Sequence, residues 1–98
     1  MMLAPTPPEH LIDAKGRPTF LWDCDLTLDE LRERLRSEDP DVRAYWMGTV
    51  MRQAKPDDAL MLMTTEAMRA NWDRIERHLG RERAFWAWLL DQLATRGQ

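Results

Sequence analysis

The chain contains 98 residues, of which 14 are basic and 17 acidic, so its formal net charge is −3. One domain fits this length, because domains commonly contain about 100 to 150 residues and a second core would be too small to be stable. The charges are interleaved, which leaves no basic stripe for a nucleic acid, and no apolar run approaches the roughly 18 residues that a membrane span needs. The N-terminus also lacks a signal core, so we expect a soluble, cytoplasmic protein without nucleic-acid or membrane partners.

Residues 1–19 are predicted to form an extended arm, because they show neither helical nor strand periodicity and are rich in turn formers. These are Pro5, Pro7, Pro8, Gly16 and Pro18. Phe20 to Trp22 is expected to continue as an extended segment packed against helices. A single helical domain is predicted for residues 20–98.

The first helix of this domain is predicted to begin after Thr27 and to end near Arg36. Thr27 and Glu30 have the spacing of a capping box, in which each side chain accepts a hydrogen bond from the backbone N–H of the other residue. Three leucines fall on one face of this helix: Leu28, Leu31 and Leu35.

A second helix is predicted over residues 40–54, because Asp39 suits the N-cap and Pro40 suits the first helical position. Met47 and Met51 extend its apolar arc beyond one face. Residues 57–63 are apolar and short, and their leucines and methionines favour a helical turn over a strand.

A third helix is expected from Thr64 or Thr65 to Leu79, with Gly80 in the left-handed C-terminal cap. The last helix is predicted over residues 81–95. Its apolar residues spread over a broad arc, and Trp88 lies outside that arc. The fold class that follows is all-α, a compact bundle of four to five short helices with an extended N-terminal arm.

One motif suggests chemistry. The run from Phe20 to Leu28 places Asp23, Asp25 and Thr27 after an apolar stretch, which resembles the nucleophile motif of magnesium-dependent haloacid-dehalogenase-like phosphatases. Residues of the types used by that superfamily's other motifs are also present: Lys55, Asp57, Asp58 and Thr64.

Three observations count against the phosphatase. The chain is too short for a doubly wound parallel sheet, in which each crossover unit needs about 30 residues. Lys55 and the acid pair precede Thr64, whereas the superfamily's order is the reverse, and a capped helix directly follows Thr27. Cys24 is the only cysteine, and His10 and His78 have no second metal ligand nearby. We therefore predict a non-enzymatic protein without catalytic residues, cofactor or metal.

Five tryptophans are the remaining compositional signal. Packing in the core accounts for most of them, but Trp88 and the edge formed by Met47 and Met51 are predicted to stay exposed. Aromatic and methionine side chains are favoured anchors of protein interfaces. The predicted partner-binding residues are Trp22, Met47, Met51, Arg52 and Trp88.

A resemblance of this chain to a known group of proteins indicates the class of protein to which the partner belongs. The chain opens on an apolar Trp-Asp segment, continues through a leucine-rich helix and a helix with an arginine near its end, and finishes with an aromatic pair. These positions are Phe20-Leu21-Trp22-Asp23, then Leu28, Leu31 and Leu35, then Arg52, and Leu79-Gly80-Arg81 before Phe85-Trp86. Over about Phe20 to Leu93 it resembles short bacterial proteins encoded beside AbiEii-type nucleotidyltransferase toxins. It departs from them at Ala59 to Met63, where they tend to carry aromatic residues.

The resemblance implies an antitoxin-like or accessory protein that restrains a nucleotidyltransferase toxin through an apolar helix face. The alternative is a self-associating structural module, in which the same apolar surface closes a homodimer by two-fold symmetry. A phosphatase that uses Asp23 is the third hypothesis.

Overall fold

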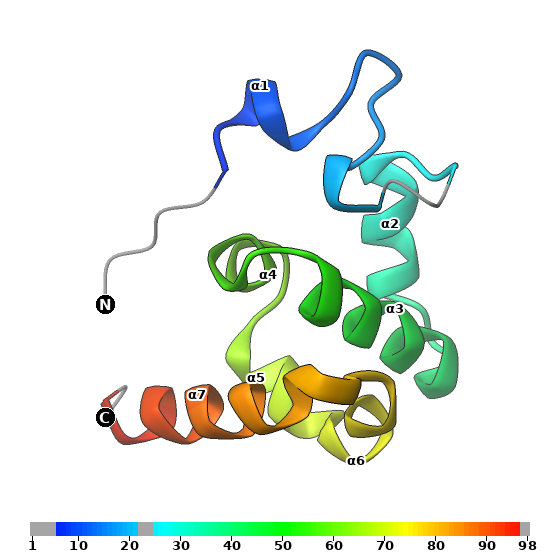
Figure 1. The fold of residues 1–98 in the computed structure, drawn as a ribbon. Helices are drawn as coiled ribbons and strands as arrows, with labels where there is room; N and C mark the ends of the chain where they lie inside the picture. The colour runs from blue at the N-terminus through cyan, green and yellow to red at the C-terminus, as the bar shows by residue number, and fades with distance from the viewer. Residues whose placement is uncertain (1–5, 22–24, 97–98) are drawn as a thin grey trace.

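Short helices joined by turns make up most of the described structure (Figure 1). In this computed structural model, which describes residues 6–21 and 25–96, seven α-helices and no β-strand are present. They are α1 (Pro8–Leu11), α2 (Leu28–Leu35), α3 (Pro40–Gln53), α4 (Pro56–Leu62), α5 (Thr65–Ala70), α6 (Trp72–Ile75) and α7 (Arg83–Arg96), with the 3₁₀ turns η1 (Thr19–Leu21), η2 (Glu76–His78) and η3 (Gly80–Glu82). The all-α prediction is confirmed.

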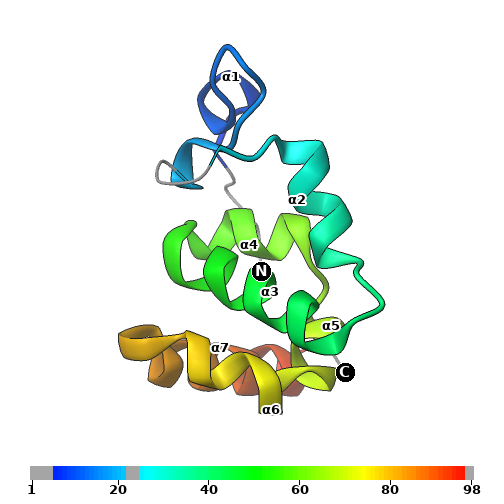
Figure 2. The same cartoon turned by 90° about the vertical axis from the view of Figure 1, so that its right-hand side faces the viewer.

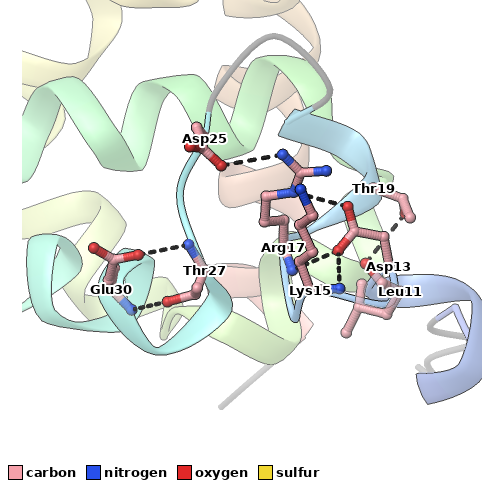
Figure 3. A network of polar contacts seen from close by, with 8 residues as sticks. All are labelled: Leu11, Asp13, Lys15, Arg17, Thr19, Asp25, Thr27 and Glu30. Atoms are coloured by element: carbon pink, nitrogen blue, oxygen red, sulfur yellow. Dashed lines mark hydrogen bonds and ion pairs between the residues drawn. The ribbon is translucent and has the colours of Figure 1, made fainter.

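The caps predicted for α2 and α3 are formed. The Thr27 N–H donates to Glu30 Oε1 at 2.9 Å, and the Glu30 N–H donates to Thr27 Oγ1 at 3.2 Å (Figure 3). The Asp39 carboxylate accepts from the backbone N–H of Asp41 at 2.9 Å. Because these bonds satisfy N–H groups that have no partner inside the helix, they fix where each helix begins.

Helix α3 runs through the middle of the molecule, with α2 on one side and α6 and α7 on the other (Figures 1 and 2). Neighbouring elements on several sides of α3 bury most of its circumference. The buried residues of α3 include Ala44, Met47, Val50 and Met51. Only 1% of Met47 and 2% of Met51 is exposed. The predicted exposed methionine edge is therefore wrong, because these side chains fill the core between layers.

Gly48 allows η2 to approach α3 closely. A Cβ atom added at Gly48 would lie 2.7 Å from the Cβ of His78, which is closer than any ordinary packing contact. His78 is half-buried there, and its ring meets the ring of Tyr45 edge-on at a centroid distance of 5.5 Å.

The predicted third helix is interrupted at Asn71, where α5 ends and α6 begins. The Asn71 side-chain amide donates to the Ala67 carbonyl oxygen at 2.7 Å, and its Oδ1 accepts from Arg43 Nη2 at 3.0 Å. Asparagine side chains compete with the backbone for hydrogen bonds in this way, which disfavours a continuous helix. The Thr64 cap and the positive φ of 54° at Gly80 agree with the prediction.

The segment before α2 is not an extended arm, which corrects the prediction for residues 1–19 over the part that is described. It forms α1, a turn with Gly16 at φ 78°, and an isolated bridge between Ile12 and Pro18. The Leu28 N–H donates to the Gly16 carbonyl oxygen at 2.9 Å, which ties the turn to the start of α2. At the other end, the Thr6 hydroxyl donates to Asp58 Oδ2 at 2.6 Å, which ties the segment to α4.

Arg17 lies between two carboxylates in this segment (Figure 3). Its Nε is 2.9 Å from Asp13 Oδ2, and its Nη1 is 3.0 Å from Asp25 Oδ1. A hydrogen bond from the backbone N–H of Arg17 is the main cause of a lowered pKa at Asp13. Phe20 and Leu21 form a 3₁₀ turn in place of the expected extended segment, while Trp22, Asp23 and Cys24 lie outside the described residues.

Candidate protein-interaction surface

The outer side of α7 carries apolar side chains where a charged surface would be usual. Ala84, Phe85, Ala87 and Trp88, here called the α7 patch, are all exposed. Trp88 is 57% exposed and Phe85 is 37% exposed, and their ring centroids lie 6.2 Å apart. Large aromatic side chains beside each other at a surface are typical of interface anchors, since they bury much area at low entropic cost.

The patch is held rigidly because the opposite side of α7 is deeply buried. Trp86 is fully buried, and its indole N–H donates to the Met51 carbonyl oxygen at 2.8 Å. At the start of α7, an ion pair joins Arg83 to Glu76 at 3.0 Å across the η2–η3 turn. The positive φ of Gly80 lets the chain reverse there. Phe85 and Trp88 therefore project from a fixed helix.

A shallow hollow of about 410 Å³ lies beside the patch, between α7 and the α5–α6 pair. Ala87 belongs to both the patch and the hollow, and Trp72 forms part of the opposite wall. Arg69 closes one side, where its Nη2 donates to the Leu90 carbonyl oxygen at 2.9 Å. A partner side chain inserted here would contact both helices.

The predicted partner-binding residues do not gather on one surface. Trp88 is exposed as expected, whereas Met47 and Met51 are core residues. Arg52 is exposed at the end of α3, where its Nη1 donates to the His78 carbonyl oxygen at 3.0 Å. Trp22 lies outside the described residues. Phe85 was missed, because its position on the predicted helix placed it within the buried arc.

The neighbourhood of Arg52 affects the protonation of His78. Burial lowers the pKa of the His78 imidazole, and the positive charges of Arg77 and Arg52 lower it further. Both causes disfavour the charged ring. The edge between α3 and η2 therefore holds neutral histidine more readily than the unfolded chain does.

The residues that suggested a phosphatase are placed differently from that superfamily's motifs. Asp25 pairs with Arg17, Thr64 caps α5, and Asp58 is buried and accepts hydrogen bonds from Thr6. The parallel sheet that would bring such motifs together is not formed by the described residues, and Asp23 lies outside them.

Among residues 6–21 and 25–96, no group of three or more histidine, cysteine, aspartate or glutamate side chains is close enough to hold a metal ion. None of the described helices has the length and apolar character of a membrane span. No protein-family model matches the chain, and no curated protein or solved structure is significantly similar to it.

Proposed function

We propose that this chain is a non-enzymatic protein-binding module that uses the α7 patch to contact another protein. The observation that supports this most strongly is the exposure of Trp88 next to Phe85 on a helix whose other face is fully packed. Burying two aromatic side chains of this size supplies several kcal/mol in favourable cases, at about 25 cal/mol per Å² of apolar surface. Arg52, at the end of α3, and Trp22 remain candidate contacts by sequence.

The partner that we propose is a nucleotidyltransferase toxin, which the chain restrains in the cytoplasm by covering its active site or holding it inactive. The resemblance of residues 20–93 to proteins encoded beside such toxins supports this identity. An antitoxin needs no chemistry of its own, which agrees with a surface built of apolar side chains.

Co-expression with the neighbouring gene product tests the proposal. We expect the two proteins to elute together, and Trp88→Ala and Phe85→Ala to weaken the complex. Tyr45→Ala is the matched control, because Tyr45 is an aromatic residue that is 48% exposed on α3. Separate elution of the wild-type proteins, or equal loss of binding in all three variants, would contradict a role for the α7 patch.

A homodimer is the second candidate, because the same patch could pair with a second copy across a two-fold axis. Light scattering on the isolated chain distinguishes the two. A stable dimer that Trp88→Ala dissociates supports self-association, whereas a monomer that binds the neighbouring product supports the partner.

The phosphatase hypothesis has a direct test. We expect no magnesium-dependent hydrolysis of p-nitrophenyl phosphate by the purified chain. Hydrolysis that Asp23→Asn abolishes would favour the enzyme over the binding module.

A further inference from the structure

A second surface, built by α2, α3, α4 and the start of α5, combines arginines with methionines. It is a groove of about 350 Å³, and α2 lies on the opposite side of α3 from α7 (Figures 1 and 2). Its lining includes Arg32, Arg36, Arg43, Met47, Met61 and Met63. Met47 and Met63 are buried, whereas Met61 is 63% exposed at the edge.

The groove is positively charged by its composition. Three arginines and no acidic residue line it, although the chain as a whole has a net charge of −3. Arg43 donates to the Ser37 carbonyl oxygen at 2.7 Å and to Asn71 Oδ1, neither of which is charged. Within the described part of the chain, none of the three arginines forms an ion pair. Their charges are therefore not neutralised by direct contact.

The groove continues into a second, more apolar hollow of about 310 Å³. Arg32, Met61 and Leu62 line both, and Leu11 and Ile12 from the N-terminal segment form the far side. Asp58 lies in this second hollow, where both of its carboxylate oxygens accept hydrogen bonds from Thr6. The two hollows thus form one surface with a basic end and an apolar end.

We propose that this surface binds an acidic, amphipathic helical segment of another protein chain. Carboxylates of that segment would pair with Arg32 and Arg36, since guanidinium groups bind carboxylates through two parallel hydrogen bonds. Its apolar side chains would lie on Met61 and extend toward Ile12. Methionine side chains adapt to differently shaped apolar partners, which suits a groove that receives a helix.

Nuclear magnetic resonance of the full chain labelled at the methionine methyl groups tests this proposal. The probe is a synthetic helix-forming peptide with leucines along one face and glutamates beside them, and its matched control carries glutamine at each glutamate. We expect the acidic peptide to shift the Met61 and Met63 signals and to leave Met68, which is buried outside the lining, unchanged. The glutamine peptide should bind at least about tenfold more weakly, because it loses charge-assisted hydrogen bonds.

Variants separate this groove from the α7 patch. Arg32→Gln and Arg36→Gln are each expected to weaken binding of the acidic peptide about tenfold. Arg81→Gln, an exposed arginine outside the groove, and Trp88→Ala should leave it unchanged. Circular dichroism checks that each variant is folded. Failure of the α7 proposal would change none of these expected results.

Several results would overturn the proposal. One is equal affinity of the wild type for the acidic and glutamine peptides, or equal affinity of the wild type, Arg32→Gln and Arg36→Gln for the acidic peptide. Another is a shift of Met61 on concentrating the chain alone, which would assign the groove to a second copy. A third is a response to decanoate without a response to the peptide, which would assign the groove to a small carboxylate ligand.

Discussion

The Trp86 indole N–H donates to the Met51 carbonyl oxygen at 2.8 Å, and both residues are buried. This bond joins the last helix to the central one at a distance of 35 residues along the chain. It also orients α7, because a helix fixed by a buried ring and a directional bond cannot rotate about its axis without losing both. The exposure of Trp88 is thus a consequence of the burial of Trp86.

Trp86→Phe tests this dependence. We expect it to lower the free energy of unfolding by about 1 to 3 kcal/mol, since the Met51 carbonyl oxygen is left without its partner and the smaller ring leaves space. Chemical denaturation followed by circular dichroism measures the change. Trp88→Phe is the control and should change stability by less than about 0.5 kcal/mol, as surface substitutions usually do. Equal effects at the two positions would contradict the assigned orientation of α7.

Gly48→Ala is expected to destabilise the fold although alanine is the better helix former by about 1 kcal/mol. The added Cβ would lie 2.7 Å from the Cβ of His78, so η2 would have to move away from α3. Overpacking of this kind costs about 1 to 3 kcal/mol. Thermal unfolding measures the loss, and combining the change with His78→Gly should remove most of the steric part. A stabilised Gly48→Ala would show that the two elements are not in close contact.

Much of the fold follows from local signals in the sequence. Thr27, Asp39 and Thr64 each cap a helix as predicted, because a cap depends on residues within one turn of it. The helical turn predicted over residues 57–63 is α4, and Pro56 stands at its first position, a role that was not predicted for it. Helix α1 was missed, since a single turn is too short to show periodicity. Its stability depends on contacts that the rest of the fold provides.

Features that depend on tertiary packing were not predictable in the same way. Met47 and Met51 looked exposed because periodicity assigns one buried face to a helix, whereas α3 is surrounded on several sides. The interruption at Asn71 depends partly on Arg43, which is distant in sequence. In the candidate site, Trp88 was identified from its position outside the apolar arc. The Arg32 and Arg36 groove appears only when α2, α3 and α4 come together.

The capping box of α2 should contribute to stability in a pH-dependent way. Hydrogen bonds from Thr27 lower the pKa of the Glu30 carboxyl from its usual value. The bond donated by the Thr27 backbone N–H is the largest cause. A carboxylate with a lowered pKa in the folded state stabilises the fold above its unfolded pKa of about 4.5. This contribution disappears as the pH falls through the lower folded value.

Glu30→Gln should therefore flatten the dependence of stability on pH below about 5, and Thr27→Ala should lower stability by about 0.5 to 2 kcal/mol. Urea denaturation at a series of pH values measures both effects. Glu33→Gln, a change of the same type at an exposed position in α2, is the matched control. If Glu33→Gln flattens the profile as much as Glu30→Gln, the cap is not the cause.

His78 should make the free energy of unfolding depend on pH near neutrality. Burial, followed by the charges of Arg77 and Arg52, lowers its pKa below the ordinary value of 6.5. The unfolded chain then binds a proton more tightly than the folded one, so stability is full above about pH 7 and falls as the pH drops through 6.5 toward the folded value. His78→Asn keeps the Cβ that packs on Gly48 but cannot titrate, and should remove this loss of stability below about pH 7. His10→Asn, at the exposed histidine of α1, is the control. An unchanged profile in His78→Asn would mean that the edge between α3 and η2 does not disfavour the charged imidazole.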